Sequence, residues 1–164
     1  VQYIDFVTQT GLRVEEALRL TRADFSSIIV RHPVTGEESE RLIMTVPGLK
    51  TSDAQATLPL SAKAEAVFRS RLGLNAAPAK PLFAVSYGRL AGKWRECKIF
   101  LRVEDNSNAT LKALRRVAAR NLHAINGMPL DITRTYLRHE NIRTTMGYLR
   151  LTGGYGADEI ARYL

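Results

Sequence analysis

The sequence has almost no cysteine, few histidines and no long hydrophobic run, and these absences exclude several classes of protein. The single cysteine, Cys97, cannot form an internal disulfide, which excludes a secreted fold held by disulfides and favours the cytoplasm. Without a CxxC motif, and with only His32, His123 and His139, the chain lacks the ligand set of a structural zinc site. No apolar stretch is long enough to span a membrane, and no signal peptide opens the chain.

Acidic residues are outnumbered by basic ones, which indicates a negatively charged partner. The chain carries 24 lysine and arginine residues against 16 aspartate and glutamate residues, a formal net charge of +8. A sequence pI near 10.0 is typical of domains that bind polyanions such as nucleic acids. Charge alone leaves open a basic protein without such a partner, so the functional prediction has to come from specific side chains.

The hydrophobic pattern predicts a mainly α-helical domain that contains a small antiparallel three-stranded β-sheet, an α+β fold. A length of 164 residues suits one domain with its own core. Three β-rich runs separated by turn segments predict the sheet between residues 27 and 60. In the helix expected at 87–103, the expected core residues are Trp94, Ile99 and Phe100. The other helices are expected at residues 1–8, 12–20, 62–72, 110–125, 129–137, 141–146 and 157–164.

Several cationic side chains and one tyrosine lie at helix ends and short connections, where they could bind and attack a phosphodiester. Its transition state gains negative charge on the non-bridging oxygens, which arginine matches with a planar, permanently charged fork. Arg13 and Arg115 are the candidate arginines, with His139 as a third donor. Tyr148 is the candidate nucleophile, and because a tyrosine hydroxyl ordinarily ionises near pH 10 it needs help from cations or a base. Lys50, in a predicted β-turn, could protonate the leaving sugar oxygen as a general acid.

Taken one at a time, these residues also fit ordinary structural positions. A lone arginine, lysine or histidine in such a place is usually solvent-exposed, and a lone tyrosine is usually half-buried packing. Lys112 and Arg115 could form one solvated helix face. Glu16 is expected to be a structural partner for a nearby cation, and Cys97 a buried small apolar residue. Only the combination of these residues, in order, carries a functional prediction.

Five short segments provide that combination. They are residues 10–18, Thr-Gly-Leu-Arg-Val-Glu-Glu-Ala-Leu; 49–60, which opens Leu-Lys-Thr; 112–115, Lys-Ala-Leu-Arg; 137–139, Leu-Arg-His; and 144–148, Thr-Thr-Met-Gly-Tyr. In this order they resemble the first arginine box, the lysine β-hairpin, the His-x-x-Arg box, the Leu-Gly-His box and the nucleophile segment of the tyrosine recombinase (phage-type integrase) family. Each box alone is weakly specific, but their order and near-family spacing are strongly specific, and the resemblance covers nearly the whole chain.

The resemblance implies a specific reaction. Tyr148 would attack DNA and form a 3′-phosphotyrosyl link, which frees a 5′-hydroxyl. Arg13, Arg115 and His139 would stabilise the transition state, and Lys50 would protonate the leaving oxygen. A 5′-hydroxyl from a partner strand would then reverse the link and exchange strands. Because the link conserves bond energy, neither ATP, nor a metal, nor any other cofactor is needed.

The resemblance also implies the architecture and the partners. Residues 1–164 would be the catalytic domain, and the upstream DNA-binding domain of the family would be missing from this sequence. Val1 is not a methionine and the first residues look like the middle of a helix, so we expect a piece of a longer chain. The partners would be double-stranded DNA and further copies of the chain, in a tetramer on two DNA sites. The last helix, 157–164, would dock on the neighbouring copy.

The sequence departs from the family pattern at two positions and leaves one assignment open. Lys112 stands where the family has a histidine, and a lysine there can still contact a phosphate. Arg138 stands where the family has a glycine. Arg115 lies 24 positions before His139, so Arg116 is a second candidate for the second arginine, although the residues around Arg115 fit the box better.

Alternative functions stay open on the sequence. They are a non-catalytic DNA-binding module of the same fold, a type IB topoisomerase-like enzyme that relaxes DNA, and an unrelated basic helical regulator. Tyr148 together with its arginines is the feature that separates an enzyme from a binder. The target DNA site, the host element and the direction of the reaction are not encoded in any pattern that we can identify.

Overall fold

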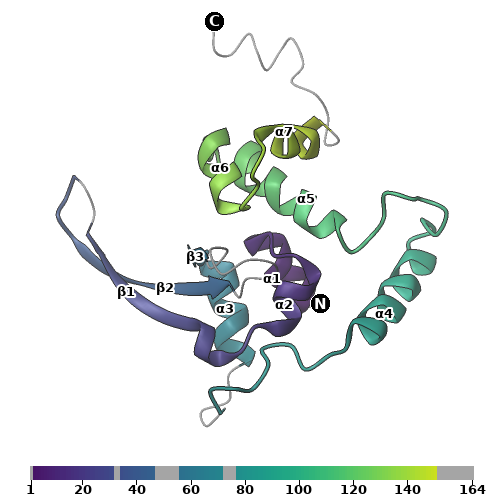
Figure 1. Cartoon of the computed structure of the whole chain (residues 1–164), viewed down its shortest axis with the longest axis horizontal. Coiled ribbons are helices and arrows are strands. Elements are labelled where there is room, and N and C mark those ends of the chain that lie inside the picture. Colours follow the sequence, from purple (N-terminus) through teal and green to yellow (C-terminus); the bar gives the residue numbers. More distant parts are fainter. Residues whose placement is uncertain (1, 32–33, 47–55, 72–76, 151–164) are drawn as a thin grey trace, which may run out of the picture.

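The computed structural model describes residues 2–31, 34–46, 56–71 and 77–150, and it confirms a mainly helical α+β fold (Figure 1). The elements are α1 (Gln2–Thr10), α2 (Val14–Arg19), β1 (Phe25–Arg31), β2 (Glu38–Val46), β3 (Ala56–Pro59), α3 (Ala62–Arg71), α4 (Tyr87–Phe100), α5 (Ala113–Arg120), α6 (Leu130–Tyr136) and α7 (Ile142–Arg150). The helix expected at 157–164 lies outside the described residues. Within the described ranges, no helix is long and apolar enough to cross a membrane.

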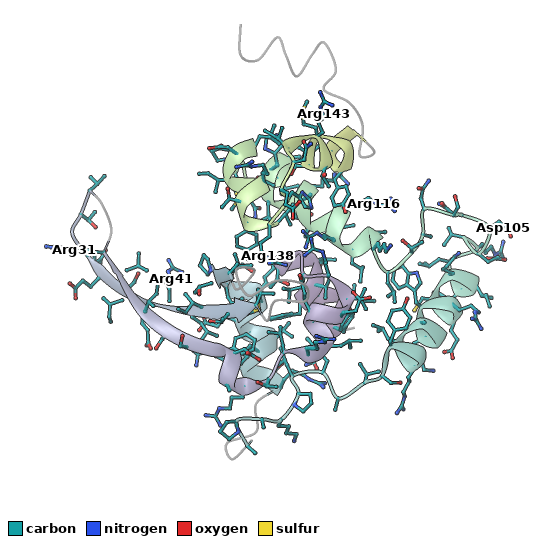
Figure 2. All side chains as sticks on the ribbon, in the orientation of Figure 1. Arg31, Arg41, Asp105, Arg116, Arg138 and Arg143 are labelled. Carbon is teal, nitrogen blue, oxygen red and sulfur yellow. The ribbon has the colours of Figure 1, made fainter. Side chains whose placement is uncertain are left out.

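The three strands form the predicted antiparallel meander, in the order β1-β2-β3. At its inner end Met44 of β2 lies between Phe25 of β1 and Leu58 of β3, and the Met44 side chain is fully buried. The outer end of the β1–β2 hairpin is exposed and projects from the body of the molecule, with Arg31 and Arg41 along it (Figures 1 and 2). The sheet therefore anchors the core at one end only.

Helix α4 corrects one expectation from the sequence. Ile99 and Phe100 are not core residues, because their side chains are 58% and 85% exposed. Trp94 is half-buried against the main core, and its indole N–H donates to the carbonyl of Ala109 at 3.0 Å. Cys97, expected to be buried, is exposed on the same helix. Figure 1 shows the reason, because α4 stands away from the main body and has little to pack against.

Helices α5, α6 and α7 form a second group beside the N-terminal helices (Figure 1). The helix expected over 110–125 begins at Ala113, and its last turn, Asn121–Ile125, is π-helical. Helix α5 contacts both α1 and α7. Its buried face carries Leu114, Ala118 and Ala119, and also a buried arginine, Arg115. A buried cation needs partners, so this helix face leads directly to the candidate site.

Gly11 brings the two groups of helices close together. Its φ of 64° lies in the left-handed region, so it ends α1 and redirects the chain into α2. A Cβ atom at this position would lie 2.3 Å from Cδ2 of Leu137, which follows α6. Glycine is therefore required twice here, for its conformation and for the close approach.

Candidate active site

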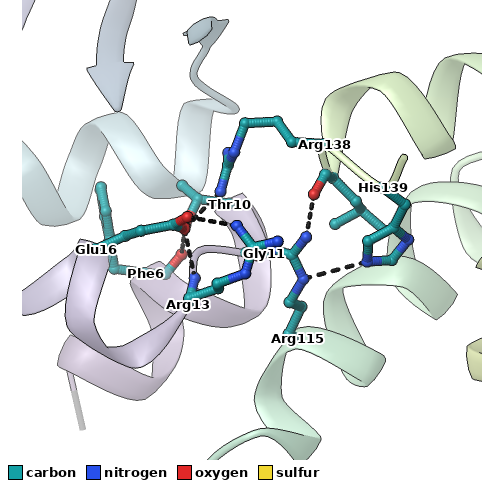
Figure 3. A network of polar contacts seen from close by, with 9 residues as sticks. Phe6, Thr10, Gly11, Arg13, Glu16, Arg115, Arg138 and His139 are labelled. Carbon is teal, nitrogen blue, oxygen red and sulfur yellow. Dashed lines mark hydrogen bonds and ion pairs between the residues drawn. The ribbon is translucent and has the colours of Figure 1, made fainter. Parts of the chain in front are cut away.

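Arg115 lies at the junction of the two groups of helices and is only 5% exposed. One terminal nitrogen donates to the carbonyl of Gly11 at 2.7 Å, and the other donates to the carbonyl of Leu137 (Figure 3). Its Nε–H donates to Nε2 of His139 at 3.3 Å. Burial, followed by the charges of Arg13 and Arg138, lowers the pKa of Arg115 to about 10, so the side chain is still a cation at neutral pH.

His139 is a neutral imidazole whose tautomer follows from its two hydrogen bonds. Because Arg115 can only donate, Nε2 of His139 accepts, and the ring proton is on Nδ1. Nδ1–H then donates to Oγ1 of Thr145 at 2.8 Å. Burial and, after it, the positive charge of Arg115, Arg13 and Arg138 lower the pKa of His139 to about 4. The site therefore holds a polar but uncharged ring between buried cations.

The turn after α6 determines where His139 points. The backbone N–H groups of Arg138 and His139 donate to the carbonyls of Thr135 and Arg134, at 2.9 and 3.1 Å, which is the Schellman pattern of a helix end. Arg138, at the centre of this turn, has a φ of 56° in the left-handed region. A residue with a Cβ atom costs about 1 kcal/mol there, which gives a physical reason for the glycine expected in this box.

Arg13 is at the N-cap of α2 rather than in its first turn. Glu16 accepts from the Arg13 backbone N–H and from its guanidinium, each at 2.7 Å, so Glu16 provides the carboxylate half of a capping box. The Glu16 side chain is buried and also pairs with Arg138 at 2.5 Å. The Arg13 side chain remains 49% exposed. Glu16 binds one guanidinium nitrogen and the backbone N–H, so the other guanidinium donors are available to a ligand.

Tyr148 lies within α7 and not beyond a short helical turn ending at Met146, which corrects the boundary expected from the sequence. Its ring meets the His139 ring edge to face, with centroids 5.0 Å apart and an interplanar angle of 89°. It also packs against the cluster of Ala119, Leu122 and Leu137. The ring is therefore held by apolar contacts.

One cleft of about 960 Å³ collects most of the predicted site residues. Arg13, Arg115, His139 and Tyr148 line it together with Lys112, the five coming from α2, the start of α5, the end of α6 and α7. The wall from α4 adds further groups, which the sequence analysis did not single out: Tyr87, Trp94, Arg95 and Lys98. The cleft thus carries five cations and is suited to an anion larger than a single phosphate.

The remaining predictions have different outcomes. Lys112 is exposed at the start of α5 and lines the cleft. Arg116 is half-buried, donates to the carbonyl of Asn108 and is not among the cleft residues (Figure 2). The structure therefore brings Arg115 and not Arg116 to His139. Lys50 lies outside the described residues. Glu16 is the expected structural partner of a cation, with two arginines instead of one.

Sequence reasoning missed Thr145, the hydrogen-bond partner of His139. Thr145 is fully buried and lies three positions before Tyr148 on α7, which places both on one helix face. The three-residue spacing could have predicted this role, because it places the Thr145 hydroxyl on the same helix face as the candidate nucleophile. Among the described residues, no group of three or more histidine, cysteine or acidic side chains is arranged to hold a metal ion.

Comparisons with known proteins show the fold. The sequence itself matches no protein-family model and no curated protein. The structure is similar to that of the Tn1549 transposon integrase in complex with a circular intermediate DNA, with a TM-score of 0.58 and 20% identity over 90% of this chain. It is also similar to the XerH site-specific recombinase bound to a palindromic difH substrate, with a TM-score of 0.62 and 20% identity over 92% of this chain. The chain spans 52% and 41% of the lengths of those two chains.

Proposed function

We propose that this chain, whose fold is that of a tyrosine recombinase catalytic domain, cuts and rejoins double-stranded DNA through a tyrosine-linked intermediate. The observation that carries the proposal is the gathering of Arg13, Arg115, His139 and Tyr148 around one basic cleft, although they come from both ends of the sequence. The structures it resembles are an integrase and a site-specific recombinase in complex with DNA, which supports the same class of partner here.

In the proposed reaction Tyr148 is the nucleophile. Its hydroxyl oxygen forms a bond to phosphorus while the bond from phosphorus to the 5′ oxygen breaks, which leaves a 3′-phosphotyrosyl link and a 5′-hydroxyl. The tyrosine proton passes to solvent water during attack, and the 5′ oxygen receives a proton from Lys50.

Arg115 and Arg13 stabilise the charge that develops on the phosphate oxygens. Each terminal nitrogen of Arg115 carries two hydrogens and gives one to a backbone carbonyl, so a second remains on each. Arg13 lines the same cleft and offers its exposed donors there. A well-placed donor of this kind contributes about 3 kcal/mol in comparable oxyanion sites.

His139 acts as a neutral hydrogen-bond donor in the proposed reaction. With a pKa lowered to about 4, the ring is uncharged at neutral pH. The hydroxyl of Thr145 can accept from or donate to Nδ1, so it supports either tautomer of the ring. When the proton moves to Nε2, the contact from Nε of Arg115 is released and Nε2–H can donate to a phosphate oxygen. Lys112, at the edge of the cleft, contacts a phosphate in place of the histidine of the family box.

Strand exchange between two DNA sites would use four copies of the chain. In this proposal the segment 157–164 docks each copy on its neighbour. One phosphodiester bond is exchanged for another at nearly equal free energy, so the proposed reaction needs no ATP. The arginines supply the positive charge at the phosphate, so the proposed reaction uses no metal. Each link would be resolved by a 5′-hydroxyl from the partner strand.

A nicked DNA substrate that releases its short 5′-hydroxyl strand tests the proposal, because it traps the covalent intermediate. The wild-type chain is expected to give a protein–DNA adduct on a denaturing gel, and Tyr148→Phe none, while both bind DNA alike in a gel shift. Tyr3→Phe is the matched control, since Tyr3 is a buried tyrosine of α1 outside the cleft. Binding without an adduct in the wild type would leave a DNA-binding module of the same fold and reject the enzyme.

A further inference from the structure

Arg138 occupies a backbone position at which a side chain is unfavourable. Its φ of 56° is left-handed, in the turn that carries His139. The side chain is also buried, with 13% exposed, and its NH1 atom has no hydrogen-bond partner among the described residues. Burial lowers the pKa of this arginine. A glycine at this position would avoid the conformational strain and the buried unpaired donor.

The Arg138 side chain connects the turn after α6 to Glu16 of α2. Its NH2 atom donates to Oε2 of Glu16 at 2.5 Å, across 122 positions of sequence. The same carboxylate holds the backbone and the guanidinium of Arg13, each at 2.7 Å. Figure 3 shows the chain of contacts running from the residue beside His139, through Glu16, to Arg13 at the cleft.

We expect the ion pair between Arg138 and Glu16 to affect the position of Arg13 more than the stability of the fold. A buried ion pair often contributes no more to folding than apolar residues of the same size, because both charges lose their hydration. Arg138 shares the Glu16 carboxylate with Arg13, so it fixes the carboxylate that holds Arg13 in place. It does not line the cleft itself.

We propose that Arg138 is a positioning residue for the DNA cleavage step: by holding Glu16 it fixes Arg13 at the cleft and ties α2 to the turn that carries His139. The inference rests on the proposed function. Arg138 stands where the family box has a glycine, so the inferred role is a feature of this chain. Small displacements matter here, because a shift of about 1 Å at a reacting group can lower a rate about 100-fold.

The test is single-turnover cleavage of the nicked substrate at saturating DNA, with DNA affinity and thermal midpoint measured on the same proteins. Arg138→Gly is expected to lower the rate about 10- to 100-fold while the DNA affinity stays within about twofold. The thermal midpoint should not fall, because the substitution removes the strain. Arg138→Lys, which keeps the charge near Glu16, should recover most of the rate.

Arg102→Gly is the matched control. Arg102 has a φ of 53° and is exposed after α4, so the same substitution relieves the same strain without touching the site. It should leave the cleavage rate unchanged. If Arg138→Gly and Arg102→Gly cleave at the wild-type rate, Arg138 positions nothing and the inference is wrong.

A double-mutant cycle with Glu16→Gln identifies the route. If Arg138 acts through Glu16, adding Arg138→Gly to Glu16→Gln should lower the rate by less than about twofold more. Rate losses that multiply would show that Arg138 acts by another route and would overturn the inference. An absence of adduct in the wild type contradicts the proposed function instead, so the two failures are distinguishable.

Discussion

At the scale of single residues, the cations of the site are held by backbone carbonyls and by one carboxylate. Arg115 is bound by the carbonyls of Gly11 and Leu137, and Arg13 and Arg138 share Glu16. The sequence identified Arg13 and Arg115 through the type of residue and the order of the boxes. It could not identify Glu16 as a bridge, because the partners of a carboxylate depend on residues 122 positions apart.

Replacing Arg115 tests how much of the fold depends on this arginine. Arg115→Ala is expected to lower the free energy of unfolding by about 3 kcal/mol, because it leaves two buried carbonyls unpaired. Arg116→Ala, next to it but only half-buried and bonded to a single carbonyl, should cost less, about 1 kcal/mol. Urea unfolding of the two variants measures the difference. Equal losses would mean that the buried contacts of Arg115 do not stabilise the fold.

His139 makes stability depend on pH in a predictable direction. Its pKa is about 4 in the folded chain and 6.5 in the unfolded chain, so the unfolded chain binds more protons between these values. The free energy of unfolding should therefore fall as the pH is lowered from 6.5 to 4 and should not change further below that through this group. The loss is at most about 3 kcal/mol. His139→Gln, which cannot titrate, should reduce this dependence in urea unfolding at a series of pH values.

At the scale of elements, the sheet and most helices can be predicted from local sequence patterns. Which of their faces other elements cover cannot be predicted in this way. The meander was predictable because turn residues separate β-rich runs, and α5 because its apolar face is periodic. The exposure of Ile99 and Phe100 was not predictable, since periodicity shows which side of α4 is apolar and not whether anything covers it. Tyr148 was placed beyond the helix expected at 141–146, but α7 continues to Arg150 and the Tyr148 ring packs on the cluster of Ala119, Leu122 and Leu137.

Gly11 is the element boundary with the most severe geometric requirement. Gly11→Ala is expected to destabilise the fold through the left-handed backbone and through a clash with Leu137, 2.3 Å from the new Cβ. Gly127→Ala has the same kind of backbone, with a φ of 70° and nothing within 4 Å, so it should cost only about 1 kcal/mol. The difference between the two thermal midpoints measures the clash. If both variants melt together, the close approach of α1 to Leu137 is not tight.

At the scale of the whole molecule, the site forms where two groups of helices meet, and residues of α4 also line the cleft. The net charge of +8 predicted a polyanionic partner, and the structure gathers five of the cations in the cleft. The sequence did not predict that α4 would supply Arg95 and Lys98, because this depends on how α4 is placed relative to α5.

Salt dependence of DNA binding tests the contribution of that wall. The logarithm of the binding constant should fall linearly with the logarithm of salt concentration, since each phosphate contact releases counterions. Arg95→Ala should reduce the magnitude of this slope by about 1 if Arg95 contacts a phosphate. Arg69→Ala on α3, whose side chain pairs with Glu65 outside the cleft, serves as the control and should leave the slope unchanged. Fluorescence anisotropy at several salt concentrations gives both values.

The carbonyl contacts of Arg115 have a consequence for how such a domain can lose activity. Because the guanidinium bridges Gly11 and Leu137, it is a tertiary cross-link as well as a source of charge. A descendant that loses Arg115 would lose part of its architecture together with the proposed chemistry. The fold does not depend on the hydroxyl of Tyr148 in this way, because apolar packing holds the ring in place. Inactive relatives that still bind DNA should therefore arise more readily by losing the tyrosine than by losing this arginine.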